Sequence, residues 1–157
     1  MAMEPMTIFS RIADPAVVAR RLRELAPDVV IDGPDANWRN AVVTSRSWLR
    51  KRRITLTHDP AYYAEPNWST QMAGMRGYIN RFPATERKET VMMLTTTLHF
   101  SLGLIFDPEN AVPGDSRLDL VYAVVQLLDG VVFTPSSLRD AHGRILFGAG
   151  GEDDEDP

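Results

Sequence analysis

Two segments of the chain share the pattern Gly-apolar-apolar-Phe-x-Pro, and each follows a stretch with helical periodicity. They occupy residues 103–108 and 130–135, so they are offset by 27 positions. That offset suits two parallel strands joined by a crossover helix, the βαβ unit. The pattern occurs too few times for a solenoid. The pair therefore predicts a sheet in which at least one connection is helical.

Strand and helix signals alternate along the rest of the chain. Asp14 and Pro15 are a typical helix start, because Asp caps the free amides and Pro suits the first turn. Helices are expected over 15–26, 69–82, 85–102 and 117–129, and strands over 6–12, 29–31, 40–45, 53–59, 131–133 and 145–147. Residues 140–143 have hairpin-turn chemistry. We expect an α+β fold: one mixed sheet with about four helices mainly on one face, a C-terminal βαβ unit and a hairpin.

The chain has 157 residues, of which 44% are hydrophobic, and this is enough for a single core. We expect one globular domain over 1–147 and a disordered, Gly-rich and acidic tail over 148–157. The absence of cysteine excludes disulfides and thiolate chemistry. No apolar run is long enough for a membrane span, and the first residues lack the pattern of a secretory signal. These observations predict a cytoplasmic protein that does not enter a membrane.

Charge is distributed unevenly along the chain. Residues 1–88 contain 14 Lys and Arg against 9 Asp and Glu, whereas residues 89–157 contain 3 against 12. Five of those acidic residues form the run Glu152–Asp156. A polarity of this kind suits electrostatic steering toward a charged partner.

The densest cluster of functional side-chain types begins near the end of the strand expected over 53–59. It comprises His58, Asp59, Tyr62, Trp68 and Gln71. Because imidazole titrates near neutral pH, these residues could wall a pocket in which His58 acts as acid or base. The alternation along this strand puts Ile54, Leu56 and His58 on one side and Thr55, Thr57 and Asp59 on the other. His58 and Asp59 therefore do not form a dyad by themselves. The aromatic side chains could equally cover the core.

Asp107 ends one of the two segments that share the Gly-Phe-Pro pattern. Ligands of open α/β sheets collect beyond the carboxyl ends of strands, so Asp107 is a further candidate binding residue. The pair Asp107-Pro108 is equally typical of a turn.

A basic cluster surrounds Trp48. It consists of Arg46, Arg50, Lys51, Arg52 and Arg53. Basic residues beside an aromatic ring can contact phosphates and stack a base. The cluster is small, however, and the acidic tail would compete with nucleic acid. A solvated strand entrance, or a contact for an acidic protein surface, is therefore favoured over nucleic acid.

Cofactor and metal chemistry have no local support in the sequence. A phosphate-binding Gly-x-x-x-x-Gly-Lys motif is absent, and the glycines at 148–151 do not precede a helix. The three histidines are about forty residues apart, which is unlike the spacing of zinc ligands. We predict no cofactor, no metal site and no catalytic residue.

Two stretches, Asn67–Tyr78 and Asp129–Ser136, carry a resemblance to other proteins. Through them, residues 54–147 resemble a group of uncharacterised bacterial proteins, and the first third of the chain is outside this resemblance. Such proteins are similar in general character to immunity proteins of toxin systems, which bind a cognate toxin and neutralise it. The resemblance does not assign any particular activity to the chain.

The first hypothesis is therefore a non-catalytic protein-binding module of the bacterial cytosol, most concretely an immunity-type protein that neutralises a cognate toxin. The alternative is a small enzyme or small-ligand-binding protein with a pocket near His58, Tyr62, Trp68 and Gln71. That alternative requires a concave site in which His58 meets a second polar group. A structure with His58 packed in an apolar core would exclude it.

Overall fold

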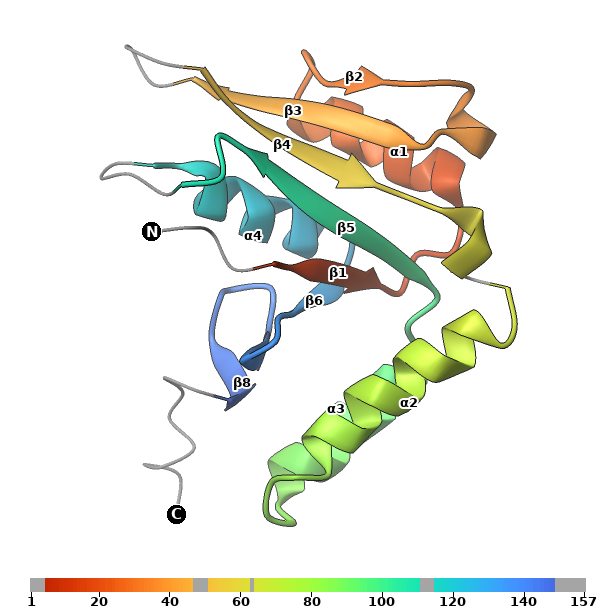
Figure 1. Cartoon of the computed structure of the whole chain (residues 1–157), viewed down its shortest axis with the longest axis vertical. Coiled ribbons are helices and arrows are strands. Elements are labelled where there is room, and N and C mark those ends of the chain that lie inside the picture. The colour runs from red at the N-terminus through yellow and green to blue at the C-terminus, as the bar shows by residue number, and fades with distance from the viewer. Residues whose placement is uncertain (1–4, 47–50, 63, 111–114, 149–157) are drawn as a thin grey trace.

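The computed structural model describes residues 5–46, 51–62, 64–110 and 115–148 (Figure 1). Its centre is an eight-stranded sheet in the order β2-β3-β4-β5-β1-β6-β7-β8. The strands are β1 (Thr7–Ser10), β2 (Val30–Ile31), β3 (Asn40–Arg46), β4 (Lys51–Thr57), β5 (Phe100–Asp107), β6 (Gly130–Phe133), β7 (Ser137–Arg139) and β8 (Ile145–Gly148). The helices are α1 (Pro15–Leu25), α2 (Asn67–Ile79), α3 (Glu86–Thr95) and α4 (Arg117–Leu127), with short 3-10 turns at η1 (Asp35–Asn37) and η2 (Pro60–Tyr62). This arrangement is α+β, as the sequence predicts.

The sheet is antiparallel at every described pairing, so the prediction of a mixed sheet is wrong. The two strands with the shared pattern, β5 and β6, do run parallel to each other. They are not neighbours, because β1 lies between them and pairs antiparallel with both. Strand β1 is thus inserted between the two strands of the expected βαβ unit, although it is about ninety residues from β5 in the sequence.

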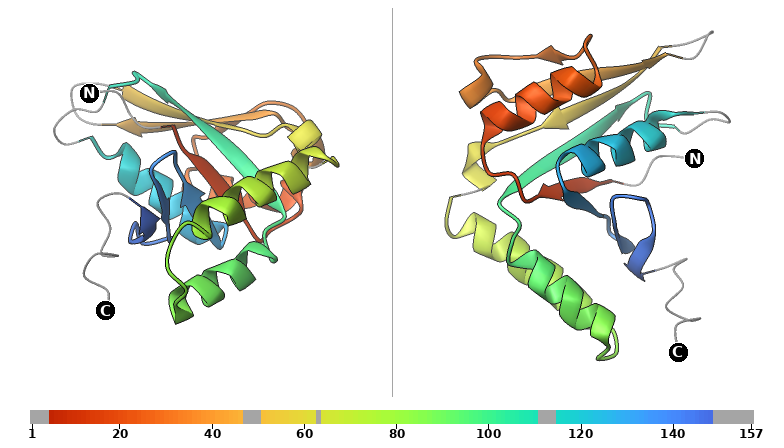
Figure 2. Two further views of the ribbon diagram at one scale, coloured as in Figure 1. Left: turned by 60° about the horizontal axis from the view of Figure 1, so that its bottom comes forward. Right: turned by 180° about the vertical axis from the view of Figure 1, so that it is seen from behind.

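Helices cover both faces of the sheet, and the prediction that they lie mainly on one face is also wrong. Helices α1 and α4 pack against the back of the sheet, as Figure 2 shows from behind. Helices α2 and α3 pack on the opposite face, where their apolar side chains form a second cluster with residues of β1, β6, β7 and β8; they extend to the lower right of the sheet in Figure 1. The reason is visible in β1, where Ile8 and Phe9 point to opposite faces and both are buried. A strand that is apolar on both sides requires cover on both sides.

Helix α1 begins as predicted: the Asp14 carboxylate accepts a hydrogen bond from the Ala16 amide at 2.9 Å, and Pro15 takes the first helical position. Helix α3 is shorter than predicted. The hydroxyls of Thr95, Thr96 and Thr97 donate to carbonyls three residues back, at 2.6–2.7 Å. These bonds end the helix, because they occupy carbonyls that a further turn would use.

The C-terminal hairpin has the predicted turn, but its first strand is β7, which the sequence analysis missed. The left-handed conformation after α4 belongs to Asp129, with φ of 48°, and not to Gly130. Gly130 instead starts β6, where a Cβ would lie 2.2 Å from the Phe9 carbonyl oxygen. Gly148 closes β8 and is buried, so it belongs to the domain; the remainder of the expected tail, 149–157, lies outside the described residues.

Two exposed glycines in α2, Gly74 and Gly77, have open space where a Cβ would lie. Close packing against another element therefore does not require glycine at either position. We expect Gly74→Ala to raise the free energy of unfolding by up to about 1 kcal/mol, since alanine loses less backbone entropy in a helix. Urea denaturation measures this change. A loss of stability would mean that the α2 surface contacts something outside the described chain.

Among the described residues, the helices are all too short or too polar to cross a bilayer.

Candidate functional site

No described helix covers the front of the sheet over β2, β3, β4 and β5 (Figure 1). We call this surface the open face. Its residues come from alternate positions of the four strands and share one side of the sheet by register. They are Val30, Val42, Thr44, Arg53, Thr55, Thr57, Ile105 and Asp107. The opposite side of the same strands supplies much of the core against α1 and α4.

One row of the open face is mainly aliphatic. Val30 lies opposite Val42, Val42 opposite Thr55, and Thr55 opposite Ile105. The two ends of this row are well exposed, Val30 at 67% and Ile105 at 58%. At the usual strand separation, the row extends over roughly 15 Å. The solvated face of an antiparallel sheet is normally polar, so a row in which three of the four side chains are aliphatic makes this surface a candidate for contact.

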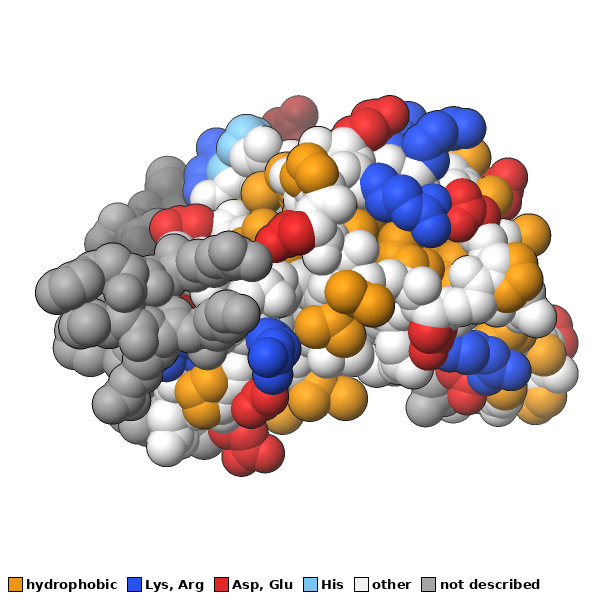
Figure 3. Space-filling model, turned by 90° about the horizontal axis from the view of Figure 1, so that it is seen from above, with side chains coloured by type: hydrophobic (Ala, Val, Ile, Leu, Met, Phe, Trp, Pro, Cys, Tyr) orange, Lys and Arg blue, Asp and Glu red, His pale blue; other side chains and the backbone are white. Residues whose placement is uncertain are grey.

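Among the described side chains of the open face, the charges are balanced. Arg53 and Asp107 are directly opposite each other on β4 and β5, and Arg53 Nη1 is 3.8 Å from Asp107 Oδ2. Both side chains are more than half exposed, so this ion pair contributes little stability. Figure 3, seen from above, likewise shows basic and acidic side chains interspersed. The basic half and the acidic half of the sequence therefore do not form separate basic and acidic areas on the side of the molecule seen in Figure 3.

His58 lies in the core. Its ring centroid is 4.7 Å from that of Phe100, nearly parallel to it, and 5.3 Å from that of Trp38. The side chain is 3% exposed. Burial lowers the pKa of the imidazole below its ordinary value, and the Arg39 charge lowers it further, while Asp59 opposes them. This is the placement that counts against a pocket built around His58.

The lowered pKa of His58 has a consequence for stability. The folded state favours neutral imidazole, so the unfolded state binds more protons once the pH falls below about 6.5. The contribution of His58 is therefore fully present above that pH and is lost as the pH falls toward the folded pKa. We expect the wild type to lose up to about 1.4 kcal/mol per pH unit in this window, and His58→Gln to lose less. Urea denaturation between pH 7 and pH 5 tests this; equal slopes would contradict it.

The other members of the His58 cluster are dispersed. Asp59 Oδ1 accepts from the Ala61 amide at 3.0 Å and from Arg39 Nη1 at 3.3 Å, so it stabilises the turn after β4. Trp68, in the first turn of α2, packs on Phe9 with 6.1 Å between the ring centroids. Gln71 lies half-buried one turn further along α2. Tyr62 ends η2, and its side chain is outside the described set.

The basic cluster is divided between the two sides of β4. Arg53 belongs to the open face, whereas Arg52 points to the opposite side, is buried, and has Nη1 4.0 Å from Asp115 Oδ2. Arg50 and the side chains of Arg46 and Lys51 lie outside the described residues. The described members therefore do not form one cationic surface.

Behind β4 lies a buried charged cluster that sequence reasoning missed. The Arg117 guanidinium is 0% exposed, and its Nε and Nη2 donate to the Asp115 carboxylate at 2.8–3.2 Å. Its remaining donors reach the carbonyls of Arg53, Pro108 and Asn110. Arg117, followed by Arg52, holds the pKa of Asp115 below its ordinary value. Because all five guanidinium donors are used within the chain, this cluster is structural.

Within the described ranges, His, Asp and Glu side chains do not gather in groups of three that could hold a metal ion. The comparisons with known proteins give no relative: no family model, curated protein or solved structure matches the chain. The open face is therefore the surface on which a functional proposal rests.

Sequence reasoning missed the open face because Ile105 and Val30 become neighbours of the central strands only through the register. The one available signal was the polar side of β4, with Thr55 and Thr57.

Proposed function

We propose that the protein is a non-catalytic protein-binding module that docks its partner on the open face. The observation that carries the proposal is the mainly aliphatic row across β2–β5, whose two ends, Val30 and Ile105, are exposed. An exposed apolar row with polar residues around it is typical of a protein interface.

The chemistry of the partner follows from the chemistry of the face. The open face has no net charge among its described residues, because Arg53 is matched by Asp107. Nucleic acid would require a cationic surface, whereas the two described members of the basic cluster, Arg52 and Arg53, each lie beside an aspartate. A flat strand surface also differs from the concave pockets that hold small molecules. The face thus fits a flat, mainly uncharged protein surface with apolar side chains at its centre.

In its most concrete form, the proposal is an immunity-type protein of the bacterial cytosol whose partner is a cognate toxin. The resemblance of residues 54–147 and the lack of a catalytic motif support this form. A pocket enzyme centred on His58 is not retained, since that imidazole is stacked against Phe100 in the core.

The test compares capture by three tagged proteins from a lysate of the source organism, at physiological salt. They are the wild type, Ile105→Lys on the open face, and Met93→Lys on α3, which replaces a similarly exposed apolar side chain elsewhere. We expect one stoichiometric protein with the wild type and Met93→Lys, and its loss with Ile105→Lys. The captured protein is then expressed alone and together with each of the three proteins. Growth arrest that the wild type and Met93→Lys relieve, and Ile105→Lys does not, supports the identification of the partner as a toxin.

Two outcomes separate the levels of the proposal. Equal retention by Ile105→Lys would overturn the open face as the docking surface. Loss with Ile105→Lys, combined with a partner that does not inhibit growth, would overturn toxin neutralisation and leave the binding module.

A further inference from the structure

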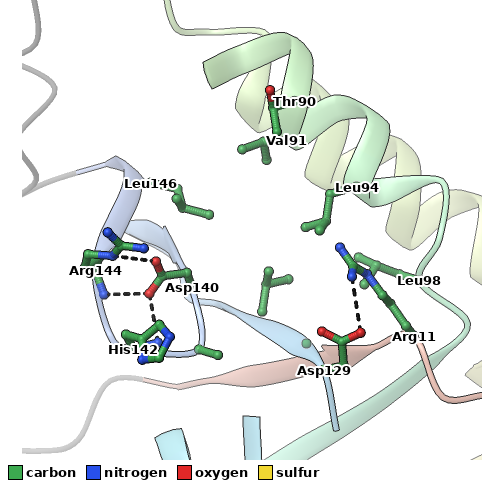
Figure 4. A pocket seen from close by; sticks show the side chains of 13 residues that line it. Arg11, Thr90, Val91, Leu94, Leu98, Asp129, Asp140, His142, Arg144 and Leu146 are labelled. Carbon is green, nitrogen blue, oxygen red and sulfur yellow. Dashed lines mark hydrogen bonds and ion pairs between the residues drawn. The ribbon is translucent and has the colours of Figure 1, made fainter. Parts of the chain in front are cut away.

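A cavity of about 320 Å³ lies between α3 and the strands β6 and β8, away from the open face (Figure 4). Its volume is at the lower end of the range for small-ligand sites. The apolar wall is formed by six side chains: Val91, Leu94, Leu98, Val131, Ala141 and Leu146. An apolar cavity of this size favours an apolar guest over water.

Charged side chains stand at two sides of the cavity. On one side, Arg11 donates from Nε to the Thr97 hydroxyl at 3.1 Å and from Nη1 to Asp129 at 3.2 Å. On the other side are Asp140 and Arg144, which belong to the β7–β8 turn (Figure 4). The two arginines therefore differ in how many of their donors are engaged.

The turn uses the whole Asp140 carboxylate. Asp140 Oδ1 accepts from the amides of His142 and Arg144 at 2.9 and 3.0 Å, and Oδ2 accepts from Arg144 Nε at 2.8 Å. The Arg144 side chain is nevertheless 79% exposed. Its two Nη groups donate to no other described residue, and the side chain lines the cavity. Two parallel N–H donors of one guanidinium match the two oxygens of a carboxylate.

We propose that this cavity binds a small amphipathic carboxylate, whose apolar chain lies between α3 and β6–β8 and whose carboxylate is bound by Arg144. The apolar wall selects the chain, and the Nη groups select the anionic end. This site is independent of the partner surface on β2–β5, because the two are lined by different residues.

The probe for the experiment is octanoate, with octanol as the neutral analogue of the same chain length. Binding is followed by amide chemical shifts in two-dimensional NMR and by titration calorimetry on the full chain. For the wild type we expect saturable octanoate binding, with shifts concentrated at residues 90–98, 129–131 and 140–146. Octanol is expected to bind at least tenfold more weakly, since it lacks the charge-assisted contact.

Two variants and one control separate the contributions. Arg144→Gln removes an exposed side chain and should weaken octanoate binding about tenfold while leaving octanol unchanged. Arg20→Gln makes the same charge change on the exposed side of α1 and should change neither. Leu94→Trp fills the cavity and should abolish binding of both probes, with circular dichroism as the check on folding.

The proposal is overturned if octanoate affinity is equal in Arg144→Gln and Arg20→Gln, or if the shifts lie outside the cavity. It is also overturned if the wild type shows no saturable binding. Because Arg144→Gln alters an exposed side chain, the test stands even where Leu94→Trp does not fold.

Discussion

Replacing Arg117 with methionine should lower the free energy of unfolding by about 3–5 kcal/mol, because it leaves Asp115 buried without its principal partner. The Asp115 side chain is 6% exposed, so water cannot replace the lost hydrogen bonds. Three backbone carbonyls, those of Arg53, Pro108 and Asn110, also lose a donor. The loss therefore combines an unpaired charge with unpaired polar groups.

Equilibrium urea denaturation measures this effect, and Arg23→Met is the matched control. Arg23 also forms a close ion pair, with Asp35 at 2.7 Å, but both side chains are nearly half exposed. We expect its removal to cost less than about 1 kcal/mol. Adding Asp115→Asn to Arg117→Met should recover part of the loss, since it removes the uncompensated charge. A loss at Arg117 no larger than at Arg23 would show that solvent reaches the cluster.

Trp38→Ala is the second substitution with a large expected effect, a loss of about 3–5 kcal/mol. Trp38 is fully buried between η1 and β3, and its Nε1 donates to the Pro15 carbonyl at 2.9 Å. Its ring also contacts His58. One side chain thus connects the start of α1 to β3 and to the end of β4, and its removal leaves a cavity at that junction.

A series of substitutions separates volume from hydrogen bonding. Trp38→Phe keeps most of the apolar volume and loses the bond to Pro15, so we expect a loss of about 1–2 kcal/mol. Trp68→Ala is the control, because Trp68, in the first turn of α2, is only half-buried and its removal should cost less than that of Trp38. Thermal and urea unfolding of the three variants give the comparison. A similar loss for both alanine variants would contradict a special role for Trp38.

Local patterns in the sequence predicted several elements correctly. The Asp14-Pro15 start of α1 and the turn at 140–143 depend on backbone hydrogen bonds within a few residues, so neighbouring side chains specify them. The alternation along β4 correctly separated the core side, with Ile54 and Leu56, from the solvent side. It also placed His58 and Asp59 on opposite sides.

Long-range pairing decided what those patterns left open. Only the register brings β1 between β5 and β6 and converts a mixed sheet into an antiparallel one. The same register assembles the row from Val30 to Ile105, whose members come from four strands. The burial of Arg117 has no local signature, because its partners other than the nearby Asp115 include Pro108 and Arg53, which are outside its own helix.

The sequence by itself determined the α+β class, the start of α1, the hairpin turn and the polarity of β4, because each follows from contacts between near neighbours. Tertiary structure alone decided the strand order, the division of helices between two faces, the burial of His58 and both candidate binding surfaces. The physical reason is that a side chain's exposure and charge environment depend on what packs against it. At these positions the packing partners come from segments that are distant in the chain.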